Sequence, residues 1–226
     1  MPIKLFYTEK GDGTPLVMLH GNGENGGFFK NQINFFAEKY RVIVPDTRGH
    51  GKSPRGTASF TFDTFADDLK ALLDSLNIKR AAILGFSDGG NTALVFTLKY
   101  PEYVEKLILN SPNLYPAGLN GLFLLFTRLS YGVFSLLSRF NKKAVRKKEL
   151  SALMAKQPDI NPKELSAIKC PTLVIAGTPD LIKKKHTRLI ADSIGGASLL
   201  FIKGGHAAAT NSAEFNRKVM SFLETE

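Results

Sequence analysis

The chain has 226 residues, a formal net charge of +10 and 43% hydrophobic residues. This length allows one domain with a full core, or one domain with a small appendage. The composition excludes a disordered chain and a bundle of membrane-spanning helices. The one cysteine, Cys170, excludes an internal disulfide framework, and we expect it to be a small buried residue in a reducing compartment. The first residues carry no secretory signal, so the expected location is the cytoplasm.

Short apolar segments that end in glycine, proline, aspartate or serine signals recur along the chain. They predict buried strands at residues 15–21, 40–46, 81–86, 105–112, 171–177 and 197–205. Their nearly continuous apolar character indicates a parallel sheet that is covered on both faces. Residues 3–13 resemble an edge strand that leads into a Gly-Asp-Gly turn.

Amphipathic segments lie between these strands. Residues 60–77 place Phe62, Phe65, Leu69, Leu72, Leu73 and Leu76 on one stripe. Residues 91–101 and 212–224 have a similar helical pattern. The alternation of strands and helices predicts a doubly wound, mostly parallel α/β fold.

Residues 113–168 interrupt this alternation because they contain no convincing strand. Their first apolar piece has about the length of a membrane span, but Arg128, Arg139, several serines and two interior glycines argue against one. We therefore expect a helical cap at 113–168, inserted into a core formed by 1–112 and 169–226.

The stretch "GFSDG" at residues 85–89 has the G-x-S-x-G pattern of a nucleophile elbow. A predicted strand precedes Ser87 and a predicted helix follows it. The backbone of such a serine is strained, so the positions two residues away must lack side chains, as Gly85 and Gly89 do. We therefore expect Ser87 to be a nucleophile at the carboxyl end of a strand, where ligands bind in open parallel sheets.

A serine nucleophile needs a base, and the base needs an orienting acid. Of the four histidines, only His206 lies in a loop after a predicted strand, follows flexible glycines, and comes after both the serine and the acid in the sequence. His186 lies in a lysine-rich helical stretch and is expected to face solvent. The strand at 171–177 is followed by Asp180, which completes the order Ser87, Asp180, His206.

The stretch "HGNG" at residues 20–23 follows a predicted buried strand, and its glycines allow close approach to a substrate oxygen. We expect the backbone N–H groups of Asn22 and Asp88 to form an oxyanion hole.

Taken together, these motifs resemble the α/β-hydrolase superfamily. The matching stretches are "HGNG" (20–23), "DTRGHGKS" (46–53), "GFSDGG" (85–90), "AGTPDLI" (176–182) and "GGH" (204–206). The resemblance implies that Asp46, Arg48 and His50 build a structural turn and perform no chemistry. It also implies an inserted cap, which here must be small and whose apolar first helix suggests a hydrophobic acyl pocket.

The implied reaction is acyl transfer through an acyl-enzyme, without a cofactor or metal. A carboxylic ester is the substrate that we favour. Thioester, amide and carbon–carbon bond hydrolysis, perhydrolysis and a non-catalytic ligand receptor remain alternatives, because a fold alone does not select among them.

The positive charge is concentrated between Arg128 and Arg188, with 14 lysine or arginine residues against four acidic ones. No nucleic-acid motif accompanies it, and the lysines of 142–148 lack interleaved aromatic residues. We expect no nucleic-acid partner. An apolar cap helix beside "NKKAVRKK" could instead make a weak contact with an anionic membrane surface.

Overall fold

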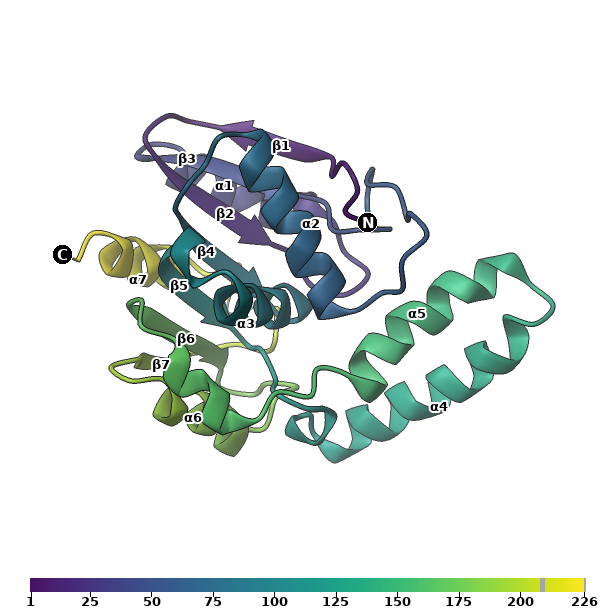
Figure 1. The fold of residues 1–226 in the computed structure, drawn as a ribbon. Coiled ribbons are helices and arrows are strands. Elements are labelled where there is room, and N and C mark those ends of the chain that lie inside the picture. The colour runs from purple at the N-terminus through teal and green to yellow at the C-terminus, as the bar shows by residue number, and fades with distance from the viewer. Residues whose placement is uncertain (208–209, 226) are drawn as a thin grey trace.

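A computed structural model of the protein describes residues 1–207 and 210–225 (Figure 1). One seven-stranded sheet has the order β1-β3-β2-β4-β5-β6-β7. Its strands are β1 (Tyr7–Lys10), β2 (Thr14–Leu19), β3 (Tyr40–Pro45), β4 (Ala81–Phe86), β5 (Val104–Asn110), β6 (Thr172–Gly177) and β7 (Ser198–Ile202). Edge strand β1 is antiparallel to β3, and the other neighbouring pairs are parallel.

Helices lie between most successive strands, and one helix follows the last strand. They are α1 (Lys30–Phe36), α2 (Phe62–Ser75), α3 (Asp88–Lys99), α4 (Gly121–Leu137), α5 (Lys142–Lys156), α6 (Lys184–Ser193) and α7 (Ala213–Leu223). Short 3₁₀ helices occur at η1 (Gly26–Phe29), η2 (Pro101–Tyr103), η3 (Pro116–Gly118) and η4 (Pro162–Ala167).

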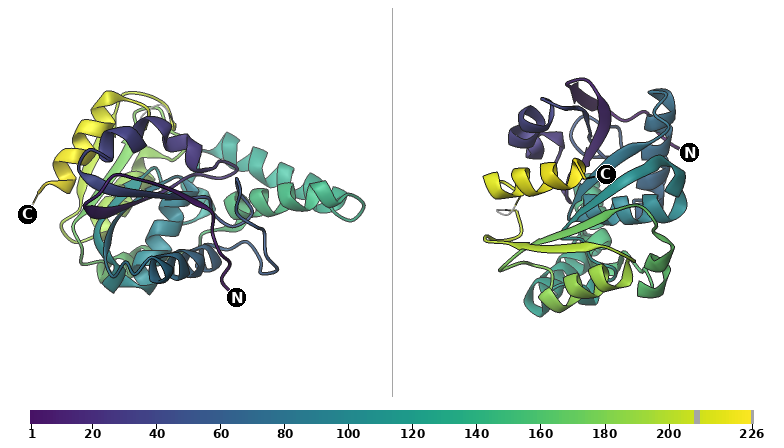
Figure 2. Two further views of the ribbon diagram at one scale, coloured as in Figure 1. Left: turned by 90° about the horizontal axis from the view of Figure 1, so that it is seen from above. Right: turned by 90° about the vertical axis from the view of Figure 1, so that its left-hand side faces the viewer.

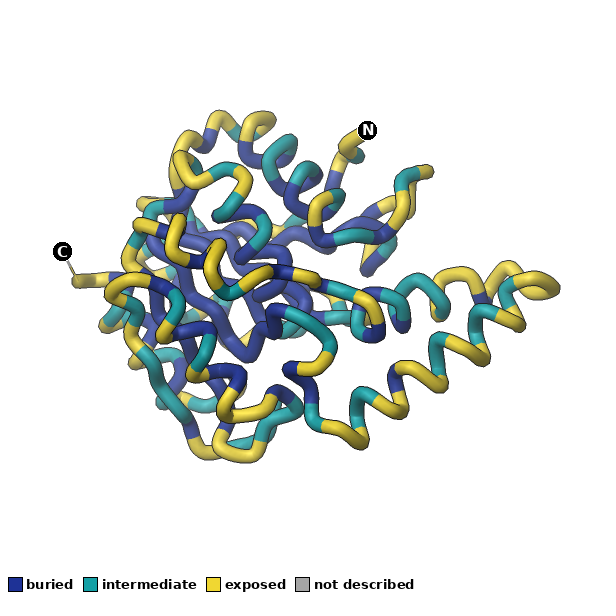
Figure 3. Tube along the Cα trace, turned by 60° about the horizontal axis from the view of Figure 1, so that its bottom comes forward, coloured by how far each residue is buried: buried dark blue, intermediate teal, exposed yellow. Residues whose placement is uncertain are grey.

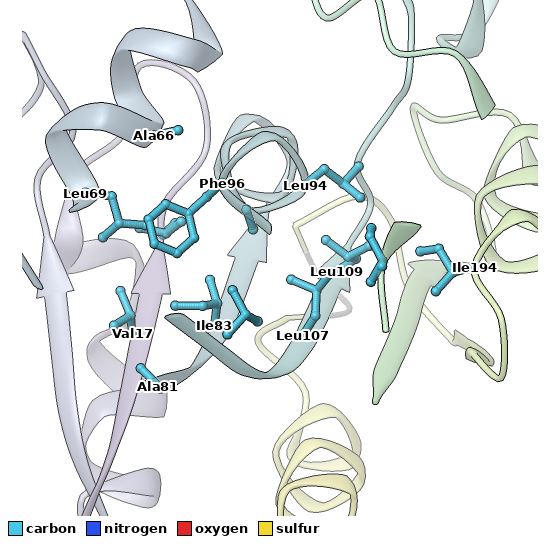
Figure 4. Packing of buried hydrophobic residues seen from close by; sticks show 14 of the residues in the cluster. Val17, Ala66, Leu69, Ala81, Ile83, Leu94, Phe96, Leu107, Leu109 and Ile194 are labelled. Carbon is cyan, nitrogen blue, oxygen red and sulfur yellow. The ribbon is translucent and has the colours of Figure 1, made fainter. Parts of the chain in front are cut away.

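Helices cover both faces of the sheet, with α1 and α7 on one side and α2, α3 and α6 on the other (Figure 2). The alternation of side chains along β2 shows why two layers are needed. Val17 and Leu19 point into the core under α2 and α3, whereas Leu16 and Met18 pack on the side of α1 and α7. Figure 4 shows the first of these cores, where Phe96 of α3 lies above the central strands.

The strand register brings the carboxyl ends of the central strands to one edge of the sheet. Leu19 of β2 pairs with Gly85 of β4, and Phe86 of β4 pairs with Asn110 of β5. Chain segments that leave β2, β4, β5, β6 and β7 therefore start side by side at this edge. This is the position at which an open α/β sheet binds its ligands.

Between β5 and β6 the chain forms a helical hairpin of α4 and α5, which projects away from the sheet (Figures 1 and 2). Asn120 and Asn141 cap the two helices, each through a side-chain oxygen that accepts a backbone N–H. None of the helices in the described residues is both long and apolar enough to cross a lipid bilayer.

The predicted doubly wound α/β fold is confirmed, and each predicted strand is present with ends that differ by a few residues. Helix α1 was not predicted, because its seven residues are too short for a clear period. Cys170 is half-buried rather than fully buried, since it precedes β6 at the edge of the core. Burial still raises the pKa of its thiol, as expected for a residue that packs rather than reacts.

Candidate active site

Ser87 lies on a sharp turn between β4 and α3. Its backbone has φ +54° and ψ −119°, a conformation that costs a non-glycine residue about 1–3 kcal/mol. A Cβ atom on Gly85 would lie 2.3 Å from the carbonyl oxygen of Gly89, and one on Gly89 would lie 2.0 Å from that of Leu19. The two glycines are therefore required by the packing of the turn, as the sequence pattern predicted.

Three residues from three loops meet at this turn. Nε2 of His206 lies 3.0 Å from Oγ of Ser87, and Nδ1 of His206 lies 2.6 Å from Oδ1 of Asp180. His206 follows β7 and Asp180 follows β6, so the parallel sheet brings together residues that are 119 positions apart. The imidazole ring also packs against Phe86, with 5.0 Å between ring centroids. This geometry lets a hydroxyl proton pass to an imidazole that a carboxylate orients.

The carboxylate of Asp180 is surrounded by hydrogen-bond donors. Its Oδ2 accepts from the hydroxyl of Ser111 at 2.7 Å and from the N–H of Gly177 at 2.9 Å, and its Oδ1 accepts from the N–H of Ile182 at 3.0 Å. Burial alone would raise the pKa of Asp180. The hydrogen bond and charge of His206, with the other donors, outweigh burial and lower the pKa.

Asn22 and Asp88, the expected oxyanion-hole residues, lie next to each other beside Ser87. Asp88 is the first residue of α3, and Asn22 belongs to the loop after β2. The amide Nδ2 of Asn22 donates to Oδ2 of Asp88 at 2.7 Å and to the carbonyl oxygen of Leu150 in α5 at 3.0 Å. Burial raises the pKa of Asp88 to about 6, although the hydrogen bond from Asn22 acts in the opposite direction.

The loop that carries Asn22 is held by two buried histidines. His20 accepts the N–H of Thr47 at its Nε2, at 3.0 Å, and His50 accepts the N–H of Gly23 at its Nε2, at 3.1 Å. Burial lowers the pKa of His20 to about 4 and also lowers that of His50, so both rings are neutral at neutral pH. We therefore assign His20 and His50 a structural role: they hold the loop near the reacting groups and take no part in the reaction.

Asp46 and Arg48 complete this support. The two carboxylate oxygens of Asp46 accept the N–H groups of Gly26 and Lys52, both at 2.7 Å. The buried guanidinium of Arg48 makes two hydrogen bonds of 2.7 Å to Asp68 on α2. These contacts support the prediction that the "DTRGHGKS" segment builds a turn.

A cavity of about 300 Å³ opens above Ser87. Its walls are mainly apolar and come from both the core and the hairpin: Phe86, Leu119, Phe123, Met154, Leu181, Ile182 and Ala207. The polar part of the lining comes from Asn22, Glu24, Ser87, Asp88, Asn113 and His206. No lysine or arginine is among the described residues that line it.

The prediction that His186 faces solvent is wrong. His186 is only 5% exposed, its Nε2 accepts the N–H of Leu114 at 2.9 Å, and its ring packs edge-on against Tyr115. The three exposed lysines before His186 made the segment look solvent-facing in the sequence. In the structure, His186 is the first residue of the buried stripe of α6, and those lysines lie outside this stripe.

Ser111 was missed by sequence reasoning, which searched this strand end for a carboxylate only. Its backbone φ of +54° is a left-handed conformation, and it turns the hydroxyl toward Asp180. A serine in "NSPN" directly after a buried strand does not by itself indicate a functional residue. The hydrogen bond between Ser111 and Asp180 is apparent only in the three-dimensional structure.

Comparisons with known proteins agree with this architecture. Residues 14–131 match the family model described as the alpha/beta hydrolase fold. The chain is 32% identical to 2-hydroxy-6-oxo-6-phenylhexa-2,4-dienoate hydrolase from Comamonas testosteroni, over 97% of this chain and 91% of that protein.

Two solved structures are similar over nearly the whole chain. A hydrolase from Pseudomonas aeruginosa PA01 has a TM-score of 0.80 and 26% identity, over 98% of this chain and 94% of its own. Est816, described as an N-acyl homoserine lactone degrading enzyme, has a TM-score of 0.78 and 29% identity, over 97% of both chains. With the fold, these matches show that the chain is an enzyme that belongs to the alpha/beta hydrolase family.

Proposed function

We propose that this hydrolase cleaves a carboxylic ester through a covalent acyl-enzyme, with Ser87, His206 and Asp180 as its catalytic triad. The observation that carries the proposal is the continuous chain of hydrogen bonds from Oγ of Ser87 through His206 to Asp180, at 3.0 and 2.6 Å. The Ser87 end of this series of hydrogen bonds lies in the wall of a mainly apolar cavity.

In the proposed reaction, Nε2 of His206 removes the proton of Ser87 while Oγ attacks the ester carbonyl carbon. The carbonyl oxygen becomes an oxyanion, which the backbone N–H groups of Asn22 and Asp88 hold. The bond to the alcohol then breaks, and His206 donates its proton to the leaving oxygen. Water, deprotonated by His206, then attacks the carbonyl carbon of the acyl-enzyme. The bond from that carbon to Oγ of Ser87 breaks, His206 returns the proton to Oγ, and the carboxylic acid leaves. Asp180 stabilises the imidazolium in both steps.

The cavity favours a neutral substrate over one that carries a carboxylate. Glu24 and Asp88 contribute carboxyl groups to the lining, and none of the described lining residues is a lysine or arginine. The Comamonas relative is named for a dienoate, which is a carboxylate. A lactone is a cyclic ester without a carboxylate, so the lactone degraded by Est816 is a closer guide to the substrate of this cavity. Carbon–carbon bond hydrolysis therefore stays an alternative to ester hydrolysis, as do thioester and amide hydrolysis.

We further propose that residues 113–168 act as a cap that shapes the acyl pocket. Phe123 of α4 and Met154 of α5 line the cavity, and the 3.0 Å bond from Asn22 to Leu150 joins the hairpin to the oxyanion loop. The cavity is at the small end of the range of ligand pockets, about 300–1,000 Å³. Short and medium acyl chains are therefore the expected substrates.

The test is hydrolysis of p-nitrophenyl esters, from acetate to long-chain acyl groups, together with labelling by a fluorophosphonate probe. We expect wild-type protein to cleave the shorter esters and to be labelled, and Ser87→Ala to do neither. Ser166→Ala, which changes an exposed serine of η4, is the control and should keep both properties.

If Ser87 is labelled but no ester is cleaved, Ser87 would remain the proposed nucleophile, and carboxylic esters would be rejected as the substrate class. If the protein is not labelled and cleaves no ester, catalysis by Ser87 would be rejected, and a ligand receptor on this fold would be favoured.

A further inference from the structure

The outer face of α4 carries a row of exposed apolar side chains. The row continues just past the end of α4 to Phe140. Its members are 45–86% exposed and recur at helical spacing: Leu122, Leu125, Phe126, Leu129, Val133, Leu136, Leu137 and Phe140. The row covers about a third of the helix circumference, which is the width of an apolar stripe that normally packs against something. Figure 3 shows this face of the projecting hairpin as largely exposed.

Helix α5 does not cover this row, because it packs against the other side of α4. Nζ of Lys147 lies 5.2 Å from the ring centroid of Phe134, and Nζ of Lys156 lies 2.7 Å from the hydroxyl of Tyr131. At 3.6 residues per turn, Tyr131 lies about 160° and Phe134 about 140° around α4 from Leu129, so α5 contacts a side of α4 that differs from the side of the row. The row is therefore a second face of the hairpin, separate from the face that lines the cavity.

The hairpin that carries the apolar row is strongly basic, and part of its charge lies beside the row at the tip. The hairpin, residues 121–156, contains eight lysine or arginine residues and one acidic residue, Glu149, which forms an ion pair with Arg55. Arg139, Lys142 and Lys143 are exposed and stand next to Phe140 at the tip, the part of the hairpin farthest from the sheet (Figure 1).

We propose that the hairpin docks on an anionic lipid surface, with the apolar row of α4 in the interface and the basic residues against lipid headgroups. An interfacial helix combines such an apolar face with lysine and arginine beside it. A second copy of this chain is a poorer occupant of the row, because face-to-face hairpins would bring two strongly cationic segments together. This docking goes beyond the proposed ester hydrolysis and does not depend on it.

The experiment is co-sedimentation of the whole protein with vesicles of phosphatidylcholine alone or with about one-third phosphatidylserine. We expect binding only to the anionic vesicles, and weaker binding at high salt because salt screens the contact. Two variants separate the contributions. Leu129→Gln with Phe140→Gln removes apolar contacts, and Lys142→Gln with Lys143→Gln removes charge at the tip.

Each variant is expected to bind the anionic vesicles at least about tenfold more weakly than wild type. All four positions are exposed, so thermal unfolding should stay unchanged. The control is Lys79→Gln with Lys169→Gln, which removes two exposed charges just before β4 and β6, at the opposite edge of the sheet from the strand ends that hold the site. The control should bind like wild type.

Three outcomes would overturn the proposal. The first is no binding to anionic vesicles. The second is an equal loss in the control, which would show a non-specific effect of net charge. The third is a wild-type dimer in gel filtration that becomes a monomer in Leu129→Gln with Phe140→Gln, which would show that a second copy covers the row.

Discussion

The side chains of Asn22 and Asp88 are joined by a hydrogen bond of 2.7 Å. These are the two residues whose backbone N–H groups we propose to hold the oxyanion, and they lie on different loops, after β2 and before α3. The bond holds these two loops together beside Ser87. Because the same amide also donates to Leu150 of α5, Asn22 connects the proposed oxyanion hole to the hairpin.

Asn22→Ala keeps the backbone donor and removes the side-chain bonds. We expect kcat for the best p-nitrophenyl ester to fall about ten- to a hundredfold, less than the loss of a whole oxyanion donor would cost. KM should change little, since the apolar walls of the cavity stay in place. Steady-state kinetics would check this, with Asn25→Ala as a control at an exposed position of the same loop. Unchanged kcat would show that the side-chain bond does not position the site.

Asp88→Asn should stabilise the folded protein at neutral pH. The pKa of Asp88 is about 6 in the folded protein and 3.8 for an ordinary aspartate, so the unfolded chain loses this proton first as the pH rises. Ionisation of Asp88 therefore lowers stability progressively between about pH 4 and pH 6, by about 2–3 kcal/mol in total. The gain in Asp88→Asn should be complete above pH 6 and absent near pH 4.

Urea unfolding of both proteins at pH 7.5 and pH 4 would measure this difference. Asp12→Asn, at an exposed turn, provides a control that should not change the free energy of unfolding at either pH. A gain for Asp88→Asn that is the same at both pH values would contradict the assignment of the effect to ionisation.

Asp180→Asn tests the proposed orienting acid. The neutral amide cannot stabilise an imidazolium by charge, and its NH2 group can donate to Nδ1 of His206 and hold the ring in the unproductive tautomer. We therefore expect kcat to fall by about ten-thousand-fold while the fold persists. Ester kinetics and circular dichroism would check the two parts. Asp192→Asn, an exposed change on α6, should leave kcat unchanged. A fall of only a few-fold would mean that another group orients His206.

Ser111→Ala removes one of the donors to Asp180, at 2.7 Å. Because that hydrogen bond helps to lower the pKa of Asp180, its loss should raise this pKa. We expect a fall in kcat of about tenfold with an unchanged KM, since Ser111 acts through Asp180 and His206. In the pH dependence of kcat, the acid limb should move to higher pH. A merely structural role would lower stability without moving this limb.

The meeting of Ser87, Asp180 and His206 could be predicted from the sequence, because each of these residues follows the end of a predicted strand. Apolar strands ending before Ser87, Asp180 and His206 identify loops that a parallel sheet must bring to one edge. The same reasoning placed Asn22 beside Ser87. It needed no knowledge of side-chain directions, only of strand order and the strained turn.

Features that depend on side-chain direction could not be predicted in this way. His186 was placed in solvent because neighbouring lysines dominated the local pattern, whereas the packing of α6 turns its ring inward. The bonds from Asn22 to Asp88 and from Ser111 to Asp180 join segments that are 66 and 69 residues apart. The sequence predicted that the first cap helix is apolar. That its apolar row faces away from α5 is apparent only in the three-dimensional structure.

The acyl-chain preference should follow the side chains that the hairpin contributes to the cavity. Met154→Ala enlarges the cavity at α5, so the optimum among p-nitrophenyl esters should move to longer acyl chains, whereas Phe123→Trp fills it from α4 and should shorten the optimum. The ratio of kcat/KM between neighbouring chain lengths should change about tenfold, the usual effect of one methylene in an apolar pocket. Leu129→Ala changes the outer face of the same hairpin and should leave the optimum where it is. If all three variants kept the wild-type optimum, the acyl group would have to bind outside this cavity, and the hairpin would not be its cap.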